Sequence, residues 1–102
     1  AAQRAKLDTV NEGVYAAMQG PRLETKAEIN RLERDGCDLV GMTGMPETAL
    51  ARELDLSYAC CAVVANWAAG RGNGKEIHDQ INDNLQKGMS QVKQLLDAFL
   101  KD

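Results

Sequence analysis

The sequence predicts an α/β fold, in which strands and helices alternate along one domain of 102 residues. Three short apolar runs are each followed by a segment with helix-start signals or helical spacing. The resulting order, strand-helix-strand-helix-strand-helix, favours a parallel sheet with right-handed crossover connections. Ligands of such sheets bind beyond the carboxyl ends of the strands, so we expect functional residues directly after each strand.

The first strand and helix are predicted by local signals. Residues 13–20 (GVYAAMQG) are compatible with a strand, and the Gly-Pro pair at their end indicates a turn. Thr25 and Glu28 have capping-box spacing, in which the threonine hydroxyl accepts from the N3 amide and the glutamate reaches back. Gly36 is placed to end this helix.

Residues 37–42 (CDLVGM) predict a second short strand, which leads into the segment Gly-Met-Thr-Gly-Met at 41–45. A helix is expected over about 46–54, because Pro46 suits the first helical turn and Glu47 favours the positive end of the helix dipole. A simple turn does not need a threonine between two glycines and two methionines. The segment is therefore a candidate binding loop.

The chain from residue 56 onward predicts a strand, a loop and a long helix. Residues 56–65 (LSYACCAVVA) are apolar on both faces, which is typical of a central strand covered on both sides. Residues 66–74 form a loop with three glycines. A helix over roughly 76–100 carries an apolar stripe of Ile77, Ile81, Leu85, Met89, Val92, Leu96 and Phe99.

Composition excludes several classes of function. Hydrophobic residues make up 44% of the chain and the net charge is −3, so neither the charge nor the four aromatic residues favour nucleic-acid binding. The longest apolar run is far shorter than the about 20 residues that a membrane helix needs. The three cysteines lack metal-ligand spacing, and we expect buried, reduced thiols in a cytoplasmic protein. No metal site is predicted.

Three stretches follow the predicted strands: 20–25 (GPRLET), 41–44 (GMTG) and 66–70 (NWAAG). We expect them to converge on one crevice at the carboxyl edge of the sheet. In this order and at these spacings, they resemble the C-terminal half of the trimeric purine nucleoside phosphorylases. That family includes the methylthioadenosine phosphorylases, and the match is closest to the bacterial 5′-methylthioinosine phosphorylase branch.

The resemblance implies roles for the loop after the second strand. Thr43 stands where the family places a hydroxyl on the phosphate nucleophile, and Met42 stands where a methionine packs against the ribose. Leu23 occupies the place of a phenylalanine commonly found against the base, so it keeps an apolar wall without ring stacking. Val40 and Gly41 are expected to line the other side of the base.

Glu24 and Asn66 stand where the resemblance implies recognition of 6-oxopurines. A 6-oxopurine presents its N1–H donor to a carboxylate and its O6 acceptor to an amide NH₂. Negative charge grows on the purine as the glycosidic bond breaks, and the Asn66 amide can stabilise that charge in the transition state. Asn66 and Thr43 are thus the candidate catalytic residues.

Each of these residues also has a purely structural interpretation. Glu24 can be a carboxylate favoured at a helix entry, Thr43 a turn hydroxyl, Asn66 a strand-end cap and Met42 a core residue. The role of Arg22 stays open.

Two further features receive no binding role from the sequence. His78 is expected to be an exposed helix residue. Residues 70–74 (GRGNG) lack the lysine and hydroxyl residue of a phosphate loop.

Proteins of this family cleave purine nucleosides with inorganic phosphate as co-substrate, and the resemblance implies no cofactor and a homotrimer. Their N-terminal half supplies a glycine-rich phosphate loop and further phosphate ligands. The family is more than twice this length and the chain begins with Ala1, so we expect residues 1–102 to be one partial domain, the C-terminal half of a nucleoside phosphorylase, inactive by itself. The alternative is a small α/β module that binds a nucleotide or a protein and catalyses nothing.

Overall fold

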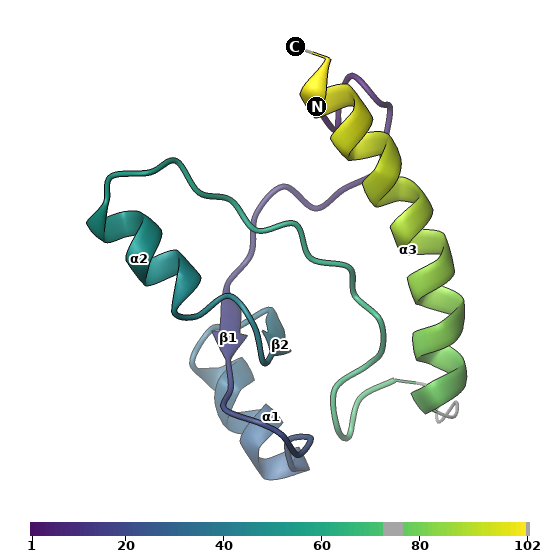
Figure 1. Ribbon diagram of the computed structural model, residues 1–102. Helices are drawn as coiled ribbons and strands as arrows, with labels where there is room; N and C mark the ends of the chain where they lie inside the picture. The colour runs from purple at the N-terminus through teal and green to yellow at the C-terminus, as the bar shows by residue number, and fades with distance from the viewer. Residues whose placement is uncertain (73–76, 102) are drawn as a thin grey trace. The chain divides into compact units, whose positions relative to one another are not determined.

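The computed structural model describes residues 1–72 and 77–101. Their elements are β1 (Tyr15–Ala17), α1 (Lys26–Arg34), β2 (Leu39–Gly41), α2 (Glu47–Glu53) and α3 (Ile77–Leu100) (Figure 1). Helices alternating with a small parallel sheet confirm the α/β class. Two predictions fall partly outside the described residues. One is the start of the last helix at residue 76, and the other is the end of the preceding loop, including the last two residues of the segment 70–74.

β1 and β2 form a parallel pair, which is joined by α1 as a crossover helix. The register pairs Tyr15 with Leu39 and Ala17 with Gly41. One further backbone bond continues the pairing past the strands, because the N–H of Met18 donates to the carbonyl of Gly41 over 2.8 Å. Both strands therefore end at the same edge of the sheet.

An aspartate side chain fixes the start of this pairing. The carboxylate of Asp38 accepts from the N–H of Val14 over 2.8 Å, and the N–H of Asp38 donates to the carbonyl of Val14 over 2.9 Å. This two-way bond holds the residues that precede β1 and β2 together, so it limits slippage of the register.

The capping box of α1 is confirmed. Thr25 is the N-cap, and its hydroxyl accepts from the N–H of Glu28 over 3.1 Å, while the Glu28 carboxylate accepts from the N–H of Thr25 over 2.9 Å. Gly36 follows the C-cap with φ 91°, a conformation that suits glycine and ends the helix as expected. α2 begins at Glu47, one residue later than expected, and Pro46 is its N-cap and not part of its first turn.

The predicted strand over residues 56–65 is wrong, because these residues form no regular secondary structure. An apolar composition favours a strand only where a neighbouring strand pairs with its N–H and C=O groups. Within the described residues the only paired strands are β1 and β2. Cys60 and Cys61 are exposed free thiols, so the expectation of buried thiols is also wrong for these two; Cys37 is half-buried.

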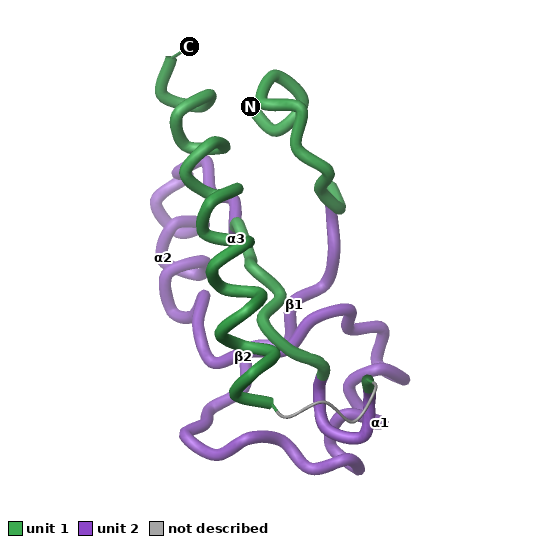
Figure 2. The backbone as a smooth tube through the Cα atoms, turned by 90° about the vertical axis from the view of Figure 1, so that its right-hand side faces the viewer, with its two compact units in different colours: residues 1–11, 61–67, 72–102 green, residues 12–60, 68–71 purple. Residues whose placement is uncertain are grey.

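The chain divides into two compact units (Figure 2). Unit 1 comprises Ala1–Asn11, Cys61–Trp67 and Gly72–Asp102; unit 2 comprises Glu12–Cys60 and Ala68–Arg71. A single domain over residues 1–102 stays a prediction.

In unit 1, side chains of α3 hold the backbone of the segment 61–67. The side-chain oxygen of Gln80 accepts from the N–H of Trp67 over 3.2 Å, and the Asn84 amide donates to the carbonyl of Ala65 over 2.8 Å. Four helical residues rise about 6 Å and two extended residues span about 6.6 Å, so the two spacings match. These side chains take the place of a partner strand.

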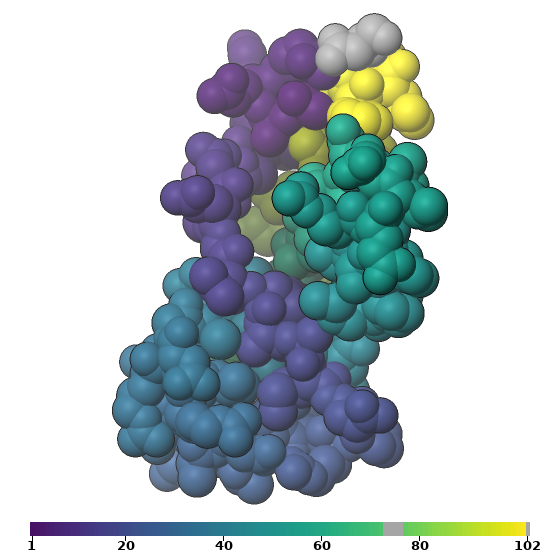
Figure 3. All heavy atoms as spheres, turned by 90° about the vertical axis from the view of Figure 1, so that its left-hand side faces the viewer, coloured from purple at the N-terminus to yellow at the C-terminus, as the bar shows by residue number. Residues whose placement is uncertain are grey.

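Few apolar side chains are buried in the described part of the chain. Ala16, Ile29 and Ala51 are the buried hydrophobic residues, and all three belong to unit 2. Side chains of α1 (blue) and α2 (teal) are visible on the face drawn in Figure 3. None of the apolar stripe of α3 is fully buried. Among the described residues, none of the helices combines the length and hydropathy that crossing a bilayer requires.

The burial of Ile29, which is 6% exposed, makes it the side chain on which unit 2 most depends. We predict that Ile29→Ala lowers the free energy of unfolding by about 2–5 kcal/mol, because it removes buried methyl groups and leaves a cavity. Urea unfolding followed by circular dichroism measures the change. Leu50→Ala, at a side chain that is 51% exposed, is the matched control and should cost about 0.5 kcal/mol. Equal losses in both variants would contradict the assigned core.

Candidate active site

Two of the three predicted stretches meet at the carboxyl edge of the sheet. Residues 20–25 follow β1, and residues 41–44 begin with the last residue of β2. The parallel register carries both loops to the same edge. Met42 lies against Gly20: a Cβ at Gly20 would be 2.5 Å from the Met42 sulfur. Gly20 also has φ 65°, so glycine is required there by both its conformation and its neighbour.

Thr43 lies against a tyrosine that the sequence did not single out. The hydroxyl oxygen of Tyr15 is 3.1 Å from the Thr43 side-chain oxygen and 3.4 Å from the Thr43 backbone nitrogen. The Tyr15 ring crosses Gly41, where a Cβ would be 2.8 Å from the tyrosine Cζ. The one feature of the sequence that could have indicated this contact is a large residue, Tyr15, on one strand near a glycine, Gly41, on the next.

The residues expected to form the apolar walls are accessible. Leu23 is 61% exposed and Met42 is 42% exposed, so Met42 is not the core residue of the structural interpretation. Val40 and Gly41 are half-buried in β2. Glu24 is half-buried and directly precedes the N-cap of α1, where the helix dipole favours a carboxylate. Five predicted site residues thus lie in or beside the two loops.

Arg22, whose role the sequence left open, is paired with Glu28. Its guanidinium donates to both carboxylate oxygens, over 2.7 and 3.2 Å, and to the Leu23 carbonyl over 3.1 Å. The hydrogen bond from Arg22 is the main cause that lowers the pKa of Glu28 from 4.5 to about 2, and the Thr25 backbone N–H lowers it further. The same bond raises the pKa of Arg22. The pair ties the loop after β1 to the first turn of α1.

Asn66 belongs to unit 1, whereas Glu24 and Thr43 belong to unit 2. The Asn66 amide donates to the carbonyl of Trp67 over 2.8 Å. Since no strand precedes it, the prediction that residues 66–70 follow a strand is wrong, and so is the strand-end cap. Gln80 and Asn84 hold the backbone on either side of Asn66, and sequence reasoning missed both because no motif marks them.

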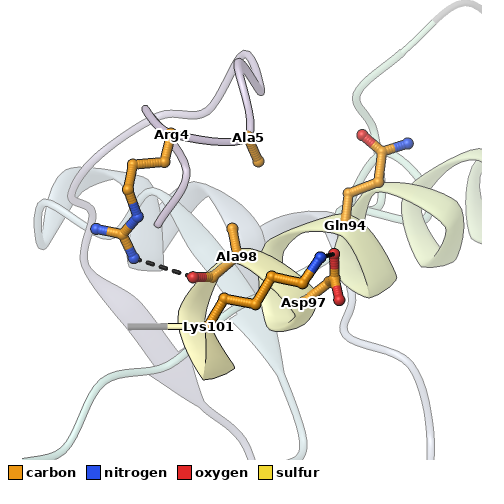
Figure 4. A pocket seen from close by; sticks show the side chains of 6 residues that line it. All are labelled: Arg4, Ala5, Gln94, Asp97, Ala98 and Lys101. Atoms are coloured by element: carbon orange, nitrogen blue, oxygen red, sulfur yellow. Dashed lines mark hydrogen bonds and ion pairs between the residues drawn. The ribbon is translucent and has the colours of Figure 1, made fainter.

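His78 is exposed in the first turn of α3, as expected. Two open hollows lie elsewhere on the described residues. One, of about 500 Å³, is in unit 1 and is lined by Arg4, Ala5, Gln94, Asp97, Ala98 and Lys101 (Figure 4). The other, in unit 2, is lined by Asn30, Glu33, Arg34 and Arg71. Neither contains a predicted site residue.

A parallel crossover unit whose two loops meet at its carboxyl edge is typical of α/β proteins, a class that binds ligands at that edge. Residues 1–101 match the family described as the phosphorylase superfamily. The chain belongs to this superfamily.

The names of individual relatives are more specific than that of the superfamily. A Pseudomonas syringae pv. tomato protein named "Probable S-methyl-5'-thioinosine phosphorylase" is 62% identical over 90 residues, which cover 88% of this chain and 37% of the relative. A Xylella fastidiosa protein of the same name is 52% identical, covering 100% of this chain and 42% of the relative. A Thermococcus kodakarensis protein named "Probable 6-oxopurine nucleoside phosphorylase" is 48% identical, and the match covers 82% of this chain and 32% of the relative. The chain therefore spans less than half the length of these relatives.

The Arg22–Glu28 pair predicts a specific pH dependence. Because the pKa of Glu28 is lowered to about 2 in the folded chain, its stabilising contribution is complete above about 4.5 and is lost as the pH falls toward about 2. We predict that Arg22→Gln moves the pKa of Glu28 upward, toward its ordinary value. Carboxyl carbon chemical shifts followed through an acid titration measure this, with Arg31→Gln on the same helix as the control. An unmoved Glu28 titration would contradict the pairing.

Proposed function

We propose that residues 1–102 are part of a phosphorylase that is as long as the relatives, which we call the long form. In it, these residues form the base- and ribose-binding part of the active site and some of the phosphate site. The long form would cleave 6-oxopurine nucleosides of the 5′-methylthioinosine or inosine type to the free base and (5-methylthio)ribose 1-phosphate. The observation that carries the proposal is the meeting of the loops 20–25 and 41–44 at one edge of the parallel pair. The names of the relatives support the same reaction.

Base recognition in this proposal rests on Glu24 and Asn66. The Glu24 carboxylate accepts from N1–H, and the Asn66 amide donates to O6 and N7. Charge that develops on the leaving purine strengthens the Asn66 bonds, which lowers the barrier to glycosidic cleavage. The accessible side chains of Leu23 and Met42 supply apolar contact to the base and the ribose, since a flexible thioether adapts to a sugar face.

Phosphate attack in this proposal rests on Thr43. Its hydroxyl donates to a phosphate oxygen and helps to hold the nucleophile in line with the breaking bond, and such positioning supplies much of the rate enhancement. The proposed enzyme needs inorganic phosphate as co-substrate and no cofactor. We further propose a cytoplasmic homotrimer.

Loss of the Thr43 hydroxyl should weaken the binding of phosphate more than the binding of nucleoside. In the long form, we predict that Thr43→Ala raises the Michaelis constant for phosphate about tenfold to a hundredfold, because a hydrogen bond to a charged group contributes about 1.5–3 kcal/mol. Steady-state release of hypoxanthine at varied phosphate measures it. Thr9→Ala, at an exposed threonine of unit 1, is the control. If phosphate affinity and turnover stay unchanged, Thr43 is only a turn residue.

Asn66→Asp tests the proposed substrate class. The unaltered long form should prefer methylthioinosine over methylthioadenosine, because adenine leaves groups at Glu24 and Asn66 unpaired, and such mismatches discriminate by several orders of magnitude. An ionised aspartate cannot donate to O6 but accepts from a 6-amino group, so we predict that the substitution narrows the preference. Glu24 still opposes adenine, which prevents full reversal.

The measurement is the ratio of kcat/KM for the two nucleosides, with Asn82→Asp on the exposed face of α3 as the matched control. A ratio unchanged by Asn66→Asp would show that Asn66 does not touch the base. A long form that releases no purine from methylthioinosine, inosine or methylthioadenosine would refute the proposed function and favour the non-catalytic module.

A further inference from the structure

Tyr15 and Thr43 are joined across the two strands by contacts that have no role in the reaction proposed above. Tyr15 lies on β1, and Thr43 is the second residue after the end of β2. The tyrosine oxygen is within 3.1 Å of the Thr43 side-chain oxygen and 3.4 Å of its backbone nitrogen. A single hydroxyl thus contacts both the side-chain oxygen and the backbone nitrogen of the residue that we assign to phosphate.

The chemistry of the two groups sets the direction of the bond to the Thr43 backbone nitrogen, whereas either hydroxyl can donate in the bond between the two side chains. The Thr43 N–H can only donate, so the tyrosine oxygen accepts from it. The hydroxyl proton of Tyr15 is then free to donate to the Thr43 side-chain oxygen. In that arrangement Thr43 keeps its own proton for a further acceptor. The opposite arrangement would turn lone pairs toward an incoming anion, which would repel it.

We infer that Tyr15 is a positioning residue that directs the hydroxyl proton of Thr43 toward the phosphate. This inference rests on the proposed function, because it takes phosphate as the ligand of Thr43. Tyr15 acts through Thr43 and does not itself touch the substrate.

Gly41 is the feature of the fold that gives Tyr15 its room. A Cβ at this position would meet the tyrosine hydroxyl and would lie 2.8 Å from Cζ and 3.4 Å from Cε2. Gly41 is not among the glycines with positive φ, so its backbone does not demand glycine. Glycine is required because the ring of Tyr15 occupies the space that a Cβ would need. Gly41→Ala should therefore displace the tyrosine and weaken the binding of phosphate.

The test is Tyr15→Phe in the long form, which keeps the ring and removes the hydroxyl. We expect the Michaelis constant for phosphate to rise about 2- to 10-fold, the effect of losing one neutral hydrogen bond. The Michaelis constant for nucleoside at saturating phosphate and the melting temperature should stay within experimental error. Tyr58→Phe, at a tyrosine that is 45% exposed, is the matched control and should change none of these values.

A double-mutant cycle makes the test specific to Thr43. In the Thr43→Ala background, Tyr15→Phe should have no further effect on phosphate, because the hydroxyl that it orients is already gone. An additive effect, an equal loss for both substrates, or no change in the single variant would overturn the inference while leaving the proposed function standing. Absence of base release by the unaltered long form would instead refute the proposed function.

Discussion

The in-register parallel pairing of β1 and β2 is the constraint on which the candidate site depends. Side chains alternate between the two faces of a strand, so a slip of one residue would turn Tyr15 away from Thr43 and separate the two loops. Two devices resist such a slip. Asp38 clamps the start of the pair through Val14, and the capping box of α1 fixes the crossover.

Local signals predicted the part of the fold that local interactions determine. The capping box at Thr25 and Glu28 and the glycine at 36 are contained in short stretches, and the structure has each of them in place. The segment 56–65 could not be predicted in this way, because a strand requires a partner that composition does not reveal. Where residues 61–67 are held, side chains of α3 hold them.

The candidate site shows the same division. The glycines around Met42 and Thr43 marked their loop as a candidate binding loop, whereas the role of Glu24 came from the resemblance to the nucleoside phosphorylases. Tyr15 escaped notice because its importance arises only across the strands, where its ring fills the space above Gly41. Arg22 also acquired its role from a contact: the Glu28 carboxylate occupies its guanidinium, so it braces the loop around Leu23 and Glu24. Candidate binding residues were easier to predict than the residues that position them.

The most direct test of the account is a crystal structure of the long form with hypoxanthine and phosphate. The account predicts a phosphate oxygen within hydrogen-bond distance of the Thr43 hydroxyl, with Tyr15 on the other side of that hydroxyl. It also predicts the base between Leu23 and β2, with its N1–H on Glu24 and its O6 on Asn66. Phosphate held away from Thr43, or a base that contacts neither Glu24 nor Asn66, would contradict it.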